Sequence, residues 1–384
     1  MQADFHYYAT YCAAYLAGYS HEEALALCYS DQFVDCCTKT FLKSVSATIH
    51  AATSQTQAEL LDMRTDMIGL QDITRIWSSF HFLPRDLYAD MPRTTGTYRN
   101  KYRLICGPNG DLVKDTVELA KGKSIQAAGI AMHVLSDTWA HQGFAGTPSL
   151  AINNTDNNFY EVLFDDTTRK ISFKHSPGAS DDIEKAVYNS TVFNTSEYSI
   201  LNLGHGHAGH LPDYSFIRYR YMPAWGGYRE LLKDNPSDYF HAFCQMIHAM
   251  KFLRGVITSF EKDTYDTETV KPHEERIKEI ISKRQQDSSE DWKLFAKELS
   301  GQDIPDFDVS AYVDEYKNAS PETRNDTFLG RFILAALSQK SMITNKIHTS
   351  GNILAGFSVD YNKRGFGGIK DYFMLVRANA RNEK

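Results

Sequence analysis

The segment Met132–Gly146 has the sequence MHVLSDTWAHQGFAG and places His133, Asp137 and His141 four residues apart. On an α-helix each step of four residues turns a side chain by only about 40°, so these three side chains share one face. Two imidazoles and a carboxylate on one stripe can converge on a divalent cation such as zinc, which takes nitrogen and oxygen ligands. A single histidine near a polar partner would favour an ordinary structural role, but this H-x3-D-x3-H triplet favours metal binding.

The residues around the triplet predict the helix that carries it. Ser124 is suited to cap the N-terminus, residues 125–131 are rich in alanine, and Gly143 and Gly146 can end the helix.

The first eighty residues predict further helices. Residues 5–17 are apolar and alanine-rich and stop at Gly18. Ser20 and Glu23 form a capping box that opens a second helix extending to about Cys37, which gives an αα-hairpin. A third long helix is expected from about residue 55 to 82, before Pro84. Residues 85–115 are expected to be an ordered loop.

The chain after residue 146 predicts a change of pattern. Phe159–Phe164 and Lys170–Lys174 are short β-prone runs around a polar turn, which predicts a hairpin inserted between helices. We therefore expect a mainly α fold, a multi-helix bundle with a small β-hairpin and a smaller helical C-terminal region. The expected division is a metal-binding catalytic domain over 1–260 with the β insertion at about 155–176, a charged linker or exposed helix over 261–290, and a helical region over 291–384.

Composition limits the class of protein. The 384 residues carry a net charge of −7, which argues against nucleic acid as a partner. No apolar run reaches the roughly 18–20 residues that a membrane span requires. The first residues lack the basic and apolar regions of a cleavable signal peptide, so we expect a protein that stays in the cytoplasm or leaves through a specialised secretion system. The spacing of the six cysteines predicts reduced thiols.

A second histidine cluster lies in residues 204–213, GHGHAGHLPD. His205, His207, His210 and Asp213 fall within nine residues, and the glycines allow tight turns that bring imidazoles together. We expect at least two of these four side chains to bind metal.

Single residues on the expected N-terminal helices complete the candidate set. His6 lies at the start of the first helix and His81 near the end of the third. Asp31 and Asp35 share a face of the second helix, and the apolar neighbours of Asp35 make it the favoured ligand of the two. The total exceeds what one four-coordinate ion needs, which predicts a site of two or three zinc ions. The candidate metal ligands are His6, Asp35, His81, His133, Asp137, His141, His205, His207, His210 and Asp213.

Four stretches together resemble a bacterial family of zinc metallophospholipases C, the phosphatidylcholine-hydrolysing type without a signal peptide known from pseudomonads and legionellae. They are residues 4–10 (DFHYYAT), 32–35 (QFVD), 133–146 and 204–213. The likeness covers about residues 1–260, and the H-x3-D step also resembles the wider zinc-dependent phospholipase C and S1/P1 nuclease fold. That resemblance implies an all-helical protein holding three zincs, with His133 and Asp137 as the positions that match.

Two features depart from the wider fold. Its secreted members use a mature N-terminal tryptophan as a zinc ligand, which this chain lacks, although Asp4 and His6 lie near the right place to substitute. The spacing from Asp137 to the next histidine is also shorter than in that fold.

The resemblance implies a zinc-dependent phospholipase C that acts peripherally on a phospholipid surface and splits the glycerol–phosphate bond. We expect Asp35 or Asp66 to be the carboxylate that orients or deprotonates the attacking water. A single-strand nuclease or phosphodiesterase using the same metals is the alternative enzyme. A metal-stabilised effector that only binds a partner protein is the alternative without catalysis. The sequence leaves the oligomeric state open.

Overall fold

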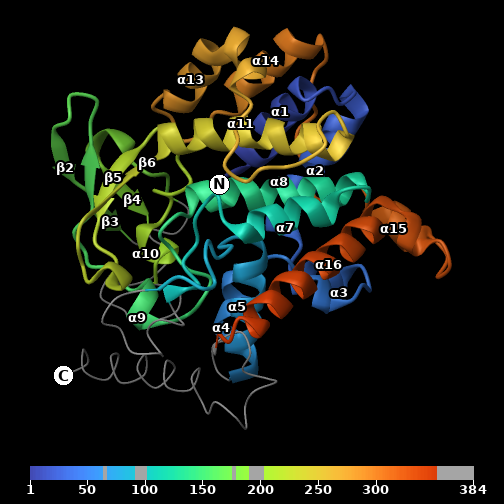
Figure 1. Cartoon of the computed structure of the whole chain (residues 1–384), viewed down its shortest axis with the longest axis horizontal. Coiled ribbons are helices and arrows are strands. Elements are labelled where there is room, and N and C mark those ends of the chain that lie inside the picture. Colours follow the sequence, from blue (N-terminus) through green and yellow to red (C-terminus); the bar gives the residue numbers. More distant parts are fainter. Residues whose placement is uncertain (64–66, 91–101, 175–178, 190–202, 353–384) are drawn as a thin grey trace.

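A computed structural model describes the chain except for residues 64–66, 91–101, 175–178, 190–202 and 353–384 (Figure 1). The described part is mainly helical, with a small antiparallel sheet at one end of the helical body (Figure 1). This confirms the expected mainly α class.

The centre of the molecule is α8 (Ile125–Ala140), the helix that carries His133 and Asp137. Ser124 accepts a hydrogen bond from the Ala127 amide and so caps this helix as predicted. Nearly all its residues are buried, because five helices pack around it: α2 (His21–Cys36), α5 (Met67–Phe80), α7 (Asp111–Ala120), α11 (Asn235–Arg254) and α16 (Phe328–Thr349). A helix that is covered on all sides holds its side chains in fixed positions, which suits a helix that supplies ligands.

The N-terminal helices follow the prediction closely. A π-helical turn η1 (Asp4–Ala9) continues into α1 (Thr10–Leu16). The capping box of Ser20 and Glu23 is present and opens α2 (His21–Cys36). The single helix expected at 55–82 is instead observed as α4 (Gln57–Met63) and α5 (Met67–Phe80).

The β structure is larger than the expected hairpin. The strands are β1 (Tyr160–Val162), β2 (Thr168–Lys170), β3 (Ser172–Lys174), β4 (Val187–Asn189), β5 (Arg218–Tyr221) and β6 (Leu231–Asp234). One sheet has the order β2-β1-β5-β6, and β3 pairs with β4 in parallel.

The predicted hairpin is therefore confirmed where β1 pairs with β2, but its second strand is shorter than expected. Tyr160 lies opposite Lys170, as a hairpin around the polar turn requires. Lys170–Lys174 is not one strand. Strand β2 ends at Lys170, Ile171 is buried, and Ser172–Lys174 forms β3, which pairs with β4. The aromatic and glycine-rich composition of residues 198–230 predicts a loop, but this stretch contains both β5 and the one-turn helix α10 (His205–Ala208).

The C-terminal helices share the central core. They are α11 (Asn235–Arg254), α12 (Thr267–Val270), α13 (Glu274–Ser282), α14 (Ser289–Ser300), α15 (Val313–Asn318) and α16 (Phe328–Thr349). One core cluster contains Phe5, Trp292 and Ile347, which lie far apart in the sequence. The expected charged linker contains α13, whose isoleucines are buried in that same core.

The remaining elements are short. They are α3 (Lys39–Ser44), α7 (Asp111–Ala120), α9 (Leu150–Asn153) and the 3-10 turns η2 (Ile49–Ala51), η3 (Ile183–Lys185), η5 (Ala224–Gly226), η6 (Lys271–His273) and η7 (Arg324–Asp326). None of the helices in the described ranges is both long and apolar enough to cross a membrane. All six cysteines are unpaired, as predicted.

Candidate metal centre

Three groups of histidine and aspartate side chains lie around α8, each with its ligand atoms within 4.8 Å of one another. We name them the deep cluster (His6, Asp31, His133), the middle cluster (Asp35, His81, His133) and the outer cluster (His141, His205, Asp213). Each could hold a metal ion. His133 belongs to both the deep and the middle cluster and so joins these two.

The spacing of ligand atoms in the middle cluster suits a small cation. His133 Nε2 lies 3.3 Å from His81 Nδ1 and 3.8 Å from Asp35 Oδ1. His81 Nδ1 lies 3.7 Å from the same carboxylate oxygen. Tetrahedral zinc with bonds of about 2.0–2.1 Å separates its ligand atoms by about 3.3 Å, so a zinc ion fits between these three atoms.

The deep cluster is fully buried, and its geometry is not explained by hydrogen bonds alone. His6 Nδ1 lies 2.7 Å from Asp31 Oδ1, and His6 Nε2 lies 3.2 Å from Asp137 Oδ1. Neither ring nitrogen has the alignment of a hydrogen bond, although both are buried. A buried polar atom without a partner is costly, and a cation between nitrogen and carboxylate would satisfy both. His6 also stacks on His133 with ring centroids 3.9 Å apart.

Asp137 joins the three clusters. Its Oδ2 lies 3.2 Å from both His81 Nδ1 and His133 Nε2, and 3.5 Å from His141 Nδ1. Its Oδ1 lies 2.8 Å from the Met1 amine, which is also 3.3 Å from Asp213 Oδ1. The N-terminus therefore lies beside α8 in the middle of the molecule, as Figure 1 shows.

The protonation states in the centre follow from this crowding. Burial by itself would lower the pKa of His133, but Asp137 and Asp35 raise it to about 10. Burial would likewise lower the pKa of the Met1 amine, but Asp137 and Asp213 raise it to about 11. Burial lowers the pKa of His141 to about 4, so this imidazole is in the neutral form that binds metal.

Two carboxylates of the centre, Asp137 and Asp213, are ionised despite their burial. Burial would raise the pKa of Asp137, but His141, the Met1 amine and His133 hold it well below its usual range. His205 and the Met1 amine do the same for Asp213. Buried negative charge needs compensation, and a divalent cation would supply it.

A pocket of about 340 Å³ opens onto the middle and outer clusters. Asp35, His81, His141, His205 and Asp213 line it, whereas the deep cluster lies beneath. Part of its wall is apolar and is built from Leu60, Trp77, Phe82 and Leu203. The middle and outer clusters thus face a cavity that could hold a ligand, whereas the deep cluster is closed.

The close packing of α2 against α8 places the aspartates opposite the histidines. At Gly129 of α8 an added Cβ would lie 2.5 Å from Leu27 O and 2.9 Å from the Asp31 amide nitrogen. Only glycine permits this approach, which brings the Asp31 carbonyl oxygen within 3.0 Å of His133 Nδ1.

Eight of the ten candidate ligands come together in this centre. They are His6, Asp35, His81, His133, Asp137, His141, His205 and Asp213. Their backbone positions come from η1, α2, α8, the loop after α5, and the segment that begins with α10.

The other two candidates lie elsewhere. His207 stacks on Phe159 in the core beneath the sheet, with ring centroids 5.6 Å apart. His210 Nδ1 lies 3.0 Å from Asp181 Oδ2. A step of two residues along a helix rotates the side-chain direction by about 200°, so His205 and His207 point to opposite sides of α10. Asp66, the second candidate general base, lies outside the described residues.

The sequence favoured Asp35 over Asp31, which the structure places in the deep cluster, and it gave no signal for one further group of the centre. Asp31 was passed over in favour of Asp35, although the i, i+4 spacing places both on the face that meets α8. The Met1 amine had no sequence signal, because no side-chain pattern marks it. Asp4 instead accepts hydrogen bonds from the Ser288 amide and hydroxyl and so ties η1 to the start of α14.

Comparison with known proteins identifies a family whose function is unknown. No curated protein and no solved structure matches the chain. A family model described as a family of unknown function (DUF6765) matches residues 1–347, which include every residue of the three clusters. The chain therefore belongs to this family of unknown function, DUF6765.

Proposed function

We propose that this protein is a zinc-dependent phosphodiester hydrolase, and that it acts as a phospholipase C on the glycerol–phosphate bond of phosphatidylcholine-like lipids. The observation that carries the proposal is three connected His/Asp clusters, two of which face a pocket whose wall is partly apolar. Nitrogen and oxygen ligands of this kind suit zinc.

The residues that line the pocket have distinct roles in this proposal. When bound, zinc ions at the clusters neutralise the phosphate oxygens and increase the acidity of water. Asp35 is the candidate general base, because its carboxylate is 32% exposed at the pocket while the other carboxylates of the centre are more deeply buried. His81 is held by a contact of 2.9 Å between its Nε2 and the Thr53 carbonyl oxygen, which keeps Nδ1 directed at the middle cluster.

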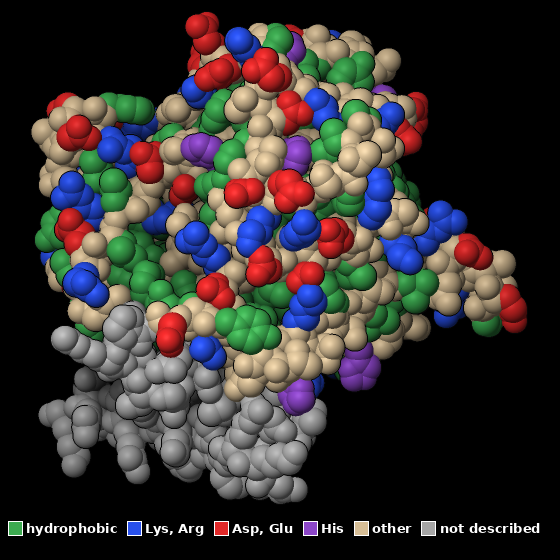
Figure 2. Space-filling view, viewed as in Figure 1, with side chains coloured by type: hydrophobic (Ala, Val, Ile, Leu, Met, Phe, Trp, Pro, Cys, Tyr) green, Lys and Arg blue, Asp and Glu red, His purple; other side chains and the backbone are tan. Residues whose placement is uncertain are grey.

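The apolar wall supports a lipid as the substrate. Leu60, Trp77, Phe82 and Leu203 offer surface to the acyl part of a molecule whose phosphate lies at the clusters. Among described residues, no lysine or arginine lines this pocket. On the face shown in Figure 2, basic and acidic side chains are interspersed rather than gathered by sign. A groove for a polyanion would require clustered positive charge.

A single-strand nuclease remains the second candidate because of one observation. Trp77 and Phe82 lie with ring centroids 5.9 Å apart beside the clusters, and aromatic rings in such a place can stack on bases.

The test combines zinc content, measured by elemental analysis, with hydrolysis of phosphatidylcholine vesicles and of single-stranded DNA. We expect two or three zinc ions per chain and release of phosphocholine that stops on chelation. His205→Ala, which removes an outer-cluster ligand, should lower the rate by about 100-fold or more. His210→Ala is the matched control from the same segment and should retain the rate, because His210 bonds Asp181 outside the clusters.

The other outcomes discriminate between the candidates. Zinc-dependent cleavage of DNA without release of phosphocholine would replace the phospholipase with the nuclease. Bound zinc without either activity would leave a metal-stabilised binding protein. No bound zinc would overturn the whole proposal.

A further inference from the structure

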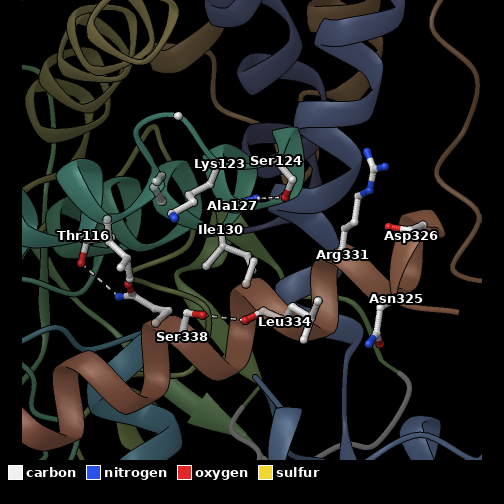
Figure 3. A pocket seen from close by; sticks show the side chains of 16 residues that line it. Thr116, Lys123, Ser124, Ala127, Ile130, Asn325, Asp326, Arg331, Leu334 and Ser338 are labelled. Carbon is white, nitrogen blue, oxygen red and sulfur yellow. Dashed lines mark hydrogen bonds between the residues drawn. The ribbon is translucent and has the colours of Figure 1, made fainter. Parts of the chain in front are cut away.

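A second pocket, of about 520 Å³, lies between α7, the N-terminal half of α8 and α16 (Figure 3). This volume is within the range of about 300–1,000 Å³ that small-molecule sites occupy. Lys123 and Thr116 lie at one end in Figure 3, and Arg331, Asn325 and Asp326 lie at the other.

This pocket is separate from the candidate metal centre although both use α8. Its residues on α8 lie in the N-terminal half of the helix, from the N-cap Ser124 to Ala131, whereas the clusters use His133 and Asp137 further along it. None of the residues that line this pocket belongs to the three clusters. The pocket therefore lies against a different part of the central helix.

The floor of the pocket is apolar. Ile130 and Leu334 lie between its two ends in Figure 3, and Leu119, Ala120, Ala127, Ala131 and Ala335 complete the surface. Leu334 is 46% exposed on α16, whose other face is in the core. Covering such a surface with an acyl chain is favourable at about 25 cal/mol per Å².

The charged side chains at the pocket lack partners within the described residues. Lys123 and Arg331 make no ion pair there, whereas their neighbours Lys121 and Lys346 bind the Phe252 carbonyl and Asp115 respectively. Asp326 lies near Arg331 and reduces the positive charge of that end. Lys123 is thus the cation left to bind an anion beside the apolar floor.

We propose that this pocket binds a single-chain anionic amphiphile of the long-chain carboxylate type, with its head group at Lys123 and its chain along Ile130 and Leu334. The occupant follows from the combination of an unpaired ammonium group with an exposed apolar floor. The inference does not depend on the proposed hydrolase, because the pocket shares no residue with the three clusters.

The test is binding of hexadecanoate to the full chain by isothermal titration calorimetry, below the concentration at which the ligand forms micelles. We expect saturable binding of one molecule per chain. Lys123→Gln should weaken it by about tenfold, the loss expected when a charged hydrogen bond is removed. Lys317→Gln removes an exposed lysine on α15 outside the pocket and should leave the affinity unchanged.

Two further measurements separate the pocket from non-specific adsorption. Ser338→Trp fills the pocket from an exposed position on α16, where the serine hydroxyl bonds only its own helix, and should abolish binding. Hexadecan-1-ol has the same chain without the charge and should bind about tenfold more weakly than the carboxylate. Chelation of metal should leave binding unchanged.

The proposal is overturned if hexadecanoate does not bind, or if Lys123→Gln and Lys317→Gln bind it equally well. It is also overturned if the alcohol binds as tightly as the acid. Should Ser338→Trp fail to fold, as circular dichroism would reveal, the lysine variants and the alcohol still decide the matter.

Discussion

At the scale of single residues, Asp137 has the largest role in the centre. It is 1% exposed and lies within 3.5 Å of four histidines and the Met1 amine. Its two oxygens face different clusters, Oδ1 toward the deep one and Oδ2 toward the middle one.

The first prediction concerns this carboxylate. Asp137→Asn should lower zinc affinity by about 100-fold or more, because it removes the charge that all three clusters share. Competition with a chromogenic chelator measures the affinity. Asp181→Asn is the matched control, since Asp181 is equally buried and bonds a histidine outside the clusters. Equal affinity in the two variants would contradict the assignment of Asp137.

The second prediction concerns His210 and Asp181. The bond to Asp181 raises the pKa of His210, and although burial opposes it, His210 and Tyr214 lower the pKa of Asp181. The contribution of His210 to stability is thus present below its ordinary pKa of about 6.5 and lost as pH rises. That of Asp181 is present above about pH 4 and lost as pH falls.

The pair should therefore stabilise the protein most between about pH 4 and 6.5. Because the His210 side chain is 47% exposed, the effect should not exceed about 1 kcal/mol. Urea unfolding at about pH 5.5 and 8.5 measures it, with His210→Gln compared to wild type at each pH. The cost of the substitution should be larger at the lower pH. A larger cost at the higher pH would contradict a stabilising contact between protonated His210 and ionised Asp181.

At the scale of elements, the contact between α2 and α8 positions the middle and deep clusters. Helix α2 supplies Asp31 and Asp35, α8 supplies His133 and Asp137, and Gly129 allows the two backbones to meet.

The third prediction tests that contact. In Gly129→Ala the new methyl group would lie 2.5 Å from both Leu27 O and Ser30 Cβ, so the helices must separate. We expect a loss of about 1–3 kcal/mol in unfolding free energy together with weaker zinc binding. Gly226→Ala is the control, because its Cβ would meet only Pro223 Cγ at 3.7 Å. A Gly129→Ala protein that binds zinc as tightly as wild type would show that the helix spacing does not set the site.

At the scale of the whole molecule, one core joins the N-terminal and C-terminal helices. The core cluster extends from Met1 to Ile347, and the family match ends at the same residue. The helices past residue 290 are therefore part of the body that supports the centre.

The fourth prediction concerns metal and global stability. In the proposed function zinc binds the folded clusters and not the unfolded chain, so free zinc at 100 times its Kd should stabilise the protein by about 2.7 kcal/mol. Differential scanning calorimetry with and without a chelator measures the change. His205→Ala should retain part of the effect, because the deep and middle clusters remain. An identical melting temperature with and without chelator would argue against metal in the folded protein.

The fifth prediction concerns the join between the sheet and the C-terminal helices. Glu161 on β1 is 1% exposed and is held by Arg169 Nε at 2.8 Å and Arg284 Nη1 at 2.5 Å. Arg284→Met leaves the buried carboxylate with one partner and should cost about 2 kcal/mol by urea unfolding. Arg276→Met breaks only an exposed pair with Glu279 and should cost less than about 0.5 kcal/mol. Similar losses in both variants would mean that burial does not strengthen the Glu161 pair.

The sequence alone was enough for α1, α2 and α8 and for most of the candidate ligands. Capping residues such as Ser20 and Ser124 are local signals, and the spacing of His133 and Asp137 fixes a shared face once the segment is helical. The mainly α class follows from the same local patterns.

Only the tertiary structure decided which segments distant in sequence come into contact. The chain from β3 to β6 was misjudged because strand pairing depends on partners far away in sequence, such as β5 beside β1. The selection of His205 over His207 depends on how the turn of α10 meets Asp213. The Met1 amine enters the centre only because η1 packs against α8 from a distance of more than a hundred residues. Local sequence therefore determined which side chains share a helix face, and only the packing of helices determined which faces meet.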